Sequence, residues 1–240
     1  LVGGVSAGGE TEVESVAALV NIAEAGPGLA QRMDEVPGAL RALVAAVAAG
    51  KDAALDSVAT LVLIARADPG LARRMAEAPG ALLALGGAVA AGGDVASSSA
   101  AGLDTVAKAG PGLARRVAEA PGALTALVAA VAARGSAAAQ NSALALASIA
   151  KADPGLAWLL AEAPGALPAL VAGVAAAGSA EEKNCALALL GITQADPQLS
   201  LRVGEAQGAL SALVQAVAVG GAAAINSAGA LGHIAEANPG

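Results

Sequence analysis

The sequence predicts an all-α solenoid made of stacked three-helix repeats. Two columns of proline recur along the chain, and a fixed period of this size is the signature of a solenoid. The period is 42 or 43 residues. The first column is Pro27, Pro69, Pro111, Pro154, Pro197 and Pro239, and the second is Pro37, Pro79, Pro121 and Pro164, with Gln207 in the last copy. Between the prolines, apolar residues recur at helical spacing.

The proline columns also set the expected repeat boundaries. We expect a single solenoid over residues 1–240, in which residues 1–25 form a partial repeat, its third helix. The full repeats are 26–67, 68–109, 110–152, 153–195 and 196–237, and residues 238–240 open a further one. The first residue is not Met and the last three resemble the start of a repeat, so we interpret the chain as part of a longer array.

Each repeat divides into three helical pieces. The first is short, as in 69–78, where an Asp or Asn often precedes a proline at the first helical position. That pair is a good helix start, because the Asp or Asn caps the helix and the missing proline N–H costs nothing there. The second piece carries an apolar stripe at i, i+3, i+4 and i+7, as in Leu124, Leu127, Val128 and Val131. In 68–109, Gly86 and Gly87 weaken this piece, so we expect it to be bent or frayed.

The third piece, at 141–152 or 181–195, is apolar over most of its circumference. A helix of that kind is normally buried, here between neighbouring repeats. One column in it holds only small residues: Ser15, Ser57, Ser99, Ser142, Cys185 and Ser227. No repeat could bury its own apolar face, so we expect stacking to supply the core.

These motifs resemble the armadillo repeat. The resemblance rests on the phrase GAL-x-AL-V, a Gly-Ser turn and the run KNCALALLGI, all between Gly165 and Thr193, and it is most similar to the arrays of plant U-box proteins. It extends over essentially all 240 residues. The resemblance implies a right-handed α-solenoid of three-helix repeats, whereas a HEAT array has two helices per repeat.

Composition limits the expected partners. The chain is 56% hydrophobic with a mean hydropathy of +0.67, and it has one Trp and no Phe or Tyr. The stretch 206–235 is uncharged and long enough to span a membrane. Its glutamines and glycines follow the repeat, so we expect a soluble chain that does not span a membrane.

Charge and cysteine content narrow the partners further. Net charge is −7, of which −5 lies in residues 1–60, and phosphate binding needs a basic stripe. We therefore expect protein partners and no nucleic acid, with a basic peptide or protein surface favoured near the N-terminal end. One cysteine excludes an internal disulfide and favours reducing, intracellular surroundings.

The resemblance also implies where peptides would bind. In peptide-binding armadillo proteins an Asn on each third helix holds the peptide backbone, and a Trp one turn earlier packs on its side chains. The corresponding Asn column here is Asn21, Leu63, Thr105, Ser148, Gly191 and His233, and the Trp column has no aromatic residue. This departure argues against an importin-like grip on basic peptides. Asn21, Thr105, Ser148 and His233 stay as candidate protein-binding residues.

A second polar column stands near the start of the third helix. Its members are Glu14, Asp56, Ser98, Asn141, Asn184 and Asn226. We favour a role in capping or in hydrogen bonding to the adjacent loop over contact with a ligand.

Trp158 and Leu159 are further candidate protein-binding residues. They replace the Arg-Arg pairs found at 73–74 and 115–116, so an exposed, charged position becomes apolar in this repeat. Exposed apolar patches often mark contacts, and Trp is a favoured anchor. The alternative is that Trp158 folds back to fill space. Both interpretations stay open.

The sequence predicts no catalytic, metal-binding or cofactor-binding site. His233 is the only histidine, and we expect no catalytic pair with Cys185, no metal site, no phosphate loop and no cofactor. We therefore expect a chain that is not an enzyme. Three functions stay open: a protein-interaction or scaffolding array, a rigid linker or peripheral subunit of a large assembly, and the substrate-recognition region of a ubiquitin ligase.

Overall fold

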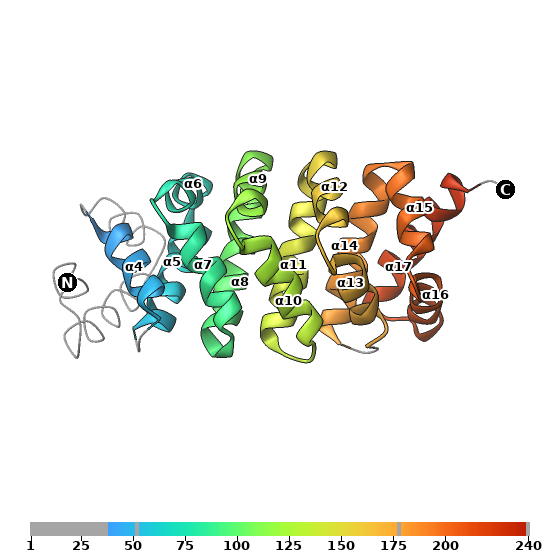
Figure 1. Cartoon of the computed structure of the whole chain (residues 1–240), viewed down its shortest axis with the longest axis horizontal. Coiled ribbons are helices and arrows are strands. Elements are labelled where there is room, and N and C mark those ends of the chain that lie inside the picture. Colours follow the sequence, from blue (N-terminus) through green and yellow to red (C-terminus); the bar gives the residue numbers. More distant parts are fainter. Residues whose placement is uncertain (1–37, 51–52, 177–178, 239–240) are drawn as a thin grey trace. The chain divides into compact units, whose positions relative to one another are not determined.

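A computed structural model describes residues 38–50, 53–176 and 179–238. Over these residues the chain forms fourteen helices and no strand, which confirms the predicted all-α solenoid (Figure 1). Asn21, the partial repeat at 1–25 and the first helix of 26–67 lie outside the described residues. The chain divides into two compact units, Leu1–Ala123 and Leu124–Gly240, which are described separately.

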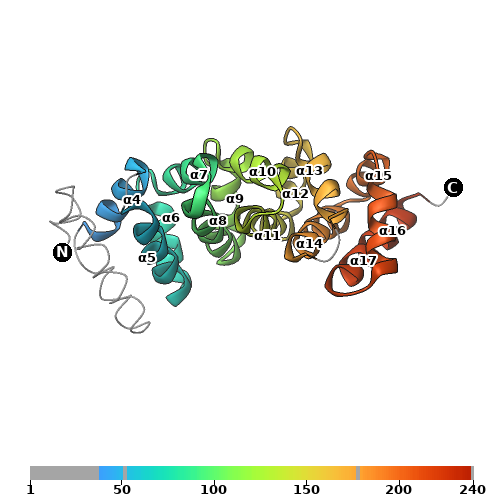
Figure 2. The same cartoon turned by 90° about the horizontal axis from the view of Figure 1, so that it is seen from below.

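The first unit contains six described helices. They are α4 (Ala39–Ala49), α5 (Ala54–Ala67), α6 (Pro69–Glu77), α7 (Ala81–Ala91), α8 (Gly93–Lys108) and α9 (Pro111–Glu119). α4 packs on α7, and α5 packs on α8, so second helices contact second helices and third helices contact third helices (Figures 1 and 2).

The second unit repeats this arrangement. Apart from Ala123, with which the first unit ends, it holds α10 (Ala123–Ala133), α11 (Ala137–Ala152), α12 (Pro154–Glu162), α13 (Ala166–Val174), α14 (Ala180–Ala195), α15 (Pro197–Glu205), α16 (Ala209–Val219) and α17 (Ala222–Ala237). The third helices α11, α14 and α17 lie side by side with α14 in the middle, and α13 contacts α16 (Figure 2).

The first helices begin with the predicted caps. The carboxylates of Asp68, Asp153 and Asp196 accept the main-chain N–H two residues further on, at 2.6, 2.8 and 2.7 Å. Each satisfies one of the unpaired donors of a helix start. These bonds fix where the chain turns from α5, α11 and α14 into the next repeat, whereas α9 begins after Gly110 without a side-chain cap.

A left-handed glycine separates the first and second helices. Gly165 and Gly208 have φ angles of 77° and 78°, a region in which L side chains are strained. The turn is the same whether proline or Gln207 precedes the glycine, because Ala163 and Ala206 also share their backbone angles.

Two details of the helices differ from the prediction. Two third helices begin earlier in the chain than predicted, at Ala137 and Ala180. Ser136 and Ser179 cap them, because each hydroxyl oxygen accepts the main-chain N–H three residues further on at 3.1 Å. The sequence predicts a bent or frayed α7, and the fraying is wrong: α7 is an unbroken helix of eleven residues, as long as its counterparts α4, α10 and α16. Gly86 serves close packing there, since a Cβ would approach Ala123 Cα to 3.0 Å.

The core lies between successive repeats. The small-residue column is fully buried at Ser57, Ser99, Ser142, Cys185 and Ser227. Val171 and Val174 of α13 are 6% and 1% exposed, whereas their counterparts on α16, Val214 and Val217, are 55% and 38% exposed. α16 covers α13, and no described helix covers α16 on its other side. The valines of a second helix are therefore buried only where another second helix packs on them.

Among the described residues no single helix is both long and apolar enough to cross a membrane, although two bent pairs, α9 with α10 and α12 with α13, meet the criteria of length and composition.

Paired substitutions test this dependence on stacking. We expect Val174→Ala to lower the free energy of unfolding by about 2 kcal/mol, because it leaves a cavity under α16. Val217→Ala, at the same register, should cost roughly 0.5 kcal/mol. Urea unfolding followed by circular dichroism measures both. Equal losses for the two variants would contradict the account.

Candidate functional site

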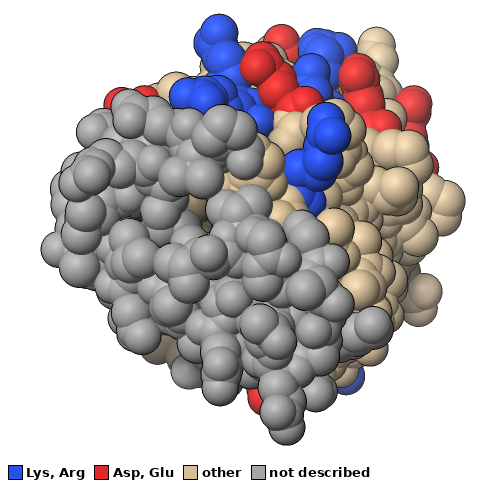
Figure 3. All heavy atoms as spheres, turned by 90° about the vertical axis from the view of Figure 1, so that its left-hand side faces the viewer, with Lys and Arg blue, Asp and Glu red and all other residues tan. Residues whose placement is uncertain are grey.

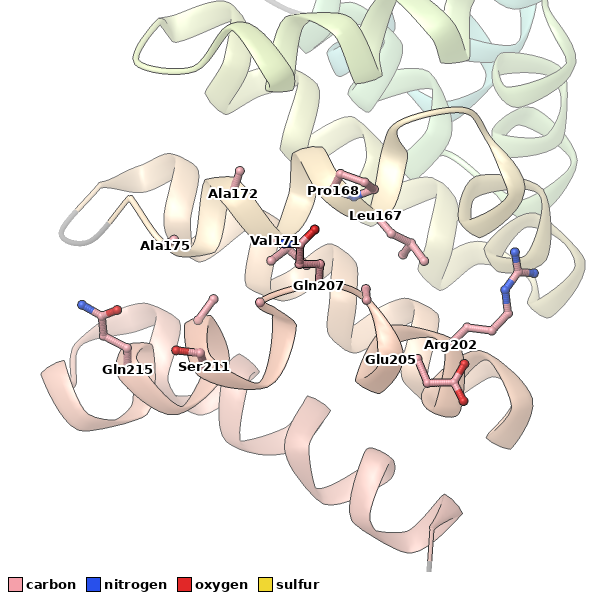
Figure 4. A pocket seen from close by; sticks show the side chains of 13 residues that line it. Leu167, Pro168, Val171, Ala172, Ala175, Arg202, Glu205, Gln207, Ser211 and Gln215 are labelled. Atoms are coloured by element: carbon pink, nitrogen blue, oxygen red, sulfur yellow. The ribbon is translucent and has the colours of Figure 1, made fainter.

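A groove of about 680 Å³ separates α13 from the α15–α16 segment (Figure 4). Its floor contains Val171 and Ala212, both buried. The α13 side is apolar, with Leu167 and Pro168 near one end. This size is typical of ligand-binding clefts in proteins.

The α16 side of the groove is polar. Ser211 and Gln215 are four residues apart on one face of α16, Gln207 lies in the turn that precedes the helix, and all three are exposed (Figure 4). They face the apolar α13 side, where Pro168 and Ala172 are also four residues apart. The groove thus has one apolar wall and one wall of uncharged hydrogen-bonding groups.

Arg202 and Glu205 of α15 close one end of the groove (Figure 4). The Arg202 guanidinium carbon lies 5.6 Å from the centre of the Trp158 ring, within cation–π range. Arg202 Nη1 is also 3.7 Å from Glu162 Oε1. Two residues of α12 therefore hold the side chain that marks this end of the groove.

Trp158 consequently has a contact within the array. It is half-buried, with Arg202 of the next repeat over its ring, while the adjacent Leu159 is 38% exposed. Both remain predicted protein-binding residues. Sequence reasoning missed Arg202, because no local pattern links it to Trp158, about one repeat earlier in the chain.

The first unit has a groove of similar size at the same place in the repeat. It measures about 690 Å³ and lies between α4 and α7. Pro79, Leu83 and Gly87 line it at the positions that Gln207, Ser211 and Gln215 hold in the last repeat. A smaller hollow of about 440 Å³ lies between the α6–α7 and α9–α10 turns.

Charged side chains gather elsewhere. Figure 3 shows Lys, Arg, Asp and Glu along the upper edge of the face in view, where Figure 1 places α6, while the described surface below is largely uncharged. Arg116 of α9 donates to the carbonyl of Ala76 in α6 at 2.9 Å, and Arg115 pairs with Glu119, four residues on in the same helix, at 3.6 Å. The first contact links α9 to α6, and the second lies on the surface of α9.

The third-helix candidates do not form one site with the groove. Ser148 lies on α11 and His233 on α17, with α14 between these helices, while Thr105 belongs to the first unit (Figure 2). The Thr105 hydroxyl donates to Ala101 O of its own helix at 2.8 Å, and His233 Nδ1 lies 3.4 Å from Glu236 Oε2.

Two members of the second polar column, Asn184 and Asn226, do not bond to the adjacent loop, so the interpretation is wrong for them. Asn184 Nδ2 donates to the carbonyl of Gln140 at 2.9 Å, and Asn226 Nδ2 donates to that of Lys183 at 3.4 Å. Each asparagine reaches back to the third helix of the preceding repeat. Its position, inside the helix and past the first turn, allows this contact because the third helices start earlier than predicted.

Cys185 lies in a buried cluster with Glu181. Glu181 Oε2 accepts the Gly135 N–H at 2.8 Å, and a Cβ at Gly173 would overlap Cys185 Sγ. Burial, and then the Glu181 charge, raise the pKa of the Cys185 thiol to about 12. Glycine at 173 thus lets α13 lie directly on this thiol.

The helix order and stacking define an armadillo-like repeat solenoid, and known structures agree. The chain is similar to a designed armadillo repeat protein, YIII(Dq)4CqI, at 25% identity, covering 97% of this chain and 98% of that one with a TM-score of 0.86.

Two other engineered proteins are also similar to this chain. A computationally designed armadillo repeat protein for modular peptide recognition is 27% identical, with 97% of both chains covered and a TM-score of 0.87. An engineered protein at 20% identity covers 98% of this chain and 95% of that one, again with a TM-score of 0.87. No family model and no curated protein matches the chain. The comparisons do not support the finer resemblance to plant U-box arrays.

The Trp158–Arg202 contact can be tested with the only tryptophan in the chain. We expect Arg202→Ala to shift Trp158 emission to longer wavelength and to increase acrylamide quenching, because the guanidinium no longer covers the ring. Arg115→Ala, a similar change whose partner is Glu119, is the control. An unchanged spectrum in Arg202→Ala would show that the two side chains do not stack.

The Cys185 thiol should be unreactive in the folded chain. At about pH 8 a thiol with this raised pKa stays protonated, and burial blocks access, so we expect DTNB to label it only after unfolding in urea. A Ser211→Cys variant supplies an exposed thiol that should react at once. Rapid labelling of the unaltered chain without denaturant would contradict the buried position.

Proposed function

We propose that this chain is a non-catalytic array that binds a segment of another protein in the groove between α13 and α16. The observation that carries the proposal is the groove itself, which combines an apolar floor and wall with a row of exposed hydrogen-bonding groups. The similar designed protein at 27% identity is described as made for modular peptide recognition, which supports a peptide ligand.

The two walls of the groove would contribute different interactions to the binding of a ligand. Apolar side chains of a ligand would gain free energy by covering Leu167, Pro168 and Val171. Gln207, Ser211 and Gln215 would hydrogen-bond the polar groups of the ligand and so fix its position, as a few placed polar groups do in most binding clefts.

The sequence-derived contact residues take secondary roles in this proposal. Trp158 stacks on Arg202 at the end of the groove, and Leu159 offers an exposed apolar contact beside it. Asn21, Thr105, Ser148 and His233 belong to the third-helix column, which we keep as a separate predicted contact surface.

The two other functions remain proposals with weaker support. A rigid linker or peripheral subunit is favoured by the surface of the last repeat, where Val214, Val219 and Ile225 are more than half exposed. A substrate-recognition role in a ubiquitin ligase rests on the sequence resemblance at 165–193 alone, and it requires a catalytic domain outside residues 1–240.

Selection from a displayed peptide library against the whole chain tests the proposal. We expect peptides that bind the chain and that lose at least tenfold in affinity with Ala172→Trp, because the new ring fills the groove. Ala129→Trp, the same change at the matching position of α10, should leave the affinity within about twofold. Isothermal titration calorimetry measures both.

Two outcomes would contradict the proposal. If selection yields no binding peptide, the chain does not act through peptide capture, and the linker role gains support. If the peptides bind but Ala172→Trp and Ala129→Trp behave alike, the chain binds peptides at a different surface.

A further inference from the structure

We propose that the outer face of the last described repeat binds a second copy of this chain, so that two chains form a symmetric dimer through α16 and α17. We call this surface the end face. Its members stand three or four residues apart on each helix, and they are Leu210, Val214 and Val217 of α16 and Ala228, Leu231 and Ala235 of α17.

The end face is separate from the peptide groove, so this inference goes beyond the proposed function. Ser211 and Gln215, which line the groove, each follow an end-face residue by one position. One position corresponds to about 100° of rotation around a helix. The two surfaces therefore lie on different sides of α16, and a chain could use both.

In the preceding repeat the equivalent surface is buried. Val171 of α13 and Ala186 of α14 are 6% and 0% exposed, because α16 and α17 pack on these two helices. Their equivalents on the end face are Val214, which is 55% exposed, and Ala228, which is also exposed (Figure 2). An end of a solenoid that faces water normally has a polar surface. The apolar end face therefore indicates a protein partner.

Charge favours a second copy as that partner. The stretch 206–235, which carries the whole end face, has no Lys, Arg, Asp or Glu, while the chain has a net charge of −7. Of the two carboxylates that flank this stretch, that of Glu205 lines the groove and that of Glu236 lies 3.4 Å from His233 Nδ1. Acidic surfaces of two copies repel each other, whereas two end faces can meet without bringing like charges together.

The side chains of the end face also complement one another in size. The three end-face residues of α16 are branched, whereas Ala228 and Ala235 make two of the three on α17 small. A two-fold axis that runs between the two helices would place α16 of each copy over α17 of the other. Larger side chains would then meet smaller ones twice, as a symmetric interface requires.

The size of the end face predicts a dimer that forms reversibly. α16 and α17 contain 11 and 16 residues, which correspond to lengths of about 16 and 24 Å. With helix axes about 10 Å apart, the end face covers roughly 400 Å² in each copy. A standard interface buries about 800 Å² in each partner, so we expect the dimer to dissociate at micromolar concentrations.

Sedimentation equilibrium of the whole chain, over a range of concentrations, tests the proposal. We expect a monomer–dimer equilibrium whose mass does not exceed that of two chains. Val214→Glu puts a charge into both halves of the interface and should raise the dissociation constant roughly tenfold or more. Leu83→Glu is the matched control, because Leu83 and Val214 are both 55% exposed. It should leave the dissociation constant within about twofold.

A mixing experiment distinguishes a symmetric dimer from a head-to-tail contact. Val214→Lys alone should associate as weakly as Val214→Glu alone. An equal mixture of the two variants should dimerise again, because opposite charges then lie in the same interface. In a head-to-tail contact, residue 214 of one chain would meet a different surface of the next chain, and mixing would restore nothing. Circular dichroism checks that both variants keep their helices.

Four outcomes would overturn the proposal. A chain that stays monomeric at every concentration would leave the end face to a further repeat or to a different protein. A mass beyond two chains, or no recovery in the mixture, would indicate head-to-tail association. Equal effects of Val214→Glu and Leu83→Glu would show that the chains associate through another surface.

Discussion

The structure depends on one constraint: no repeat can bury its own apolar surface. Second and third helices present leucine, valine and alanine to the next repeat, and the burial of these side chains is decided by what lies beside them. Val171 and Val174 are buried because α16 packs on α13, while the valines at the equivalent positions of α16 are exposed. The hydrophobic effect therefore acts between repeats and makes the stack the unit of stability.

Polar contacts fix the register of this stacking. The asparagines at 184 and 226 each bond to the main chain of the preceding third helix, and Glu181 bonds to the loop after α10. Glycine acts in the same direction at Gly173, where the absence of a Cβ allows α13 to lie on Cys185. Burial alone would allow adjacent helices to slide, whereas these contacts link particular residues of neighbouring repeats.

The same geometry makes the grooves. Where α4 packs on α7, and where α13 packs on α16, the exposed positions beside the buried stripe border a cleft. Equivalent positions of the repeat line both clefts, but different residues occupy them. Two clefts of nearly equal volume are therefore lined by Pro, Leu and Gly in one unit and by Gln, Ser and Gln in the other. Functional specificity can thus change without any change in the fold, because exposed positions contribute little to packing.

The sequence by itself determined the fold class, the helix order, the Asp caps and the buried small-residue column, because each follows from local periodicity and capping chemistry. It also located Trp158 as a departure from the repeat. Only the tertiary structure decided that Arg202 covers Trp158, that the asparagines bond backward to the preceding helix and that α7 is regular despite Gly86 and Gly87. It alone showed that Gln207, Ser211 and Gln215 line a cleft, because contacts between residues about forty positions apart depend on how the repeats stack.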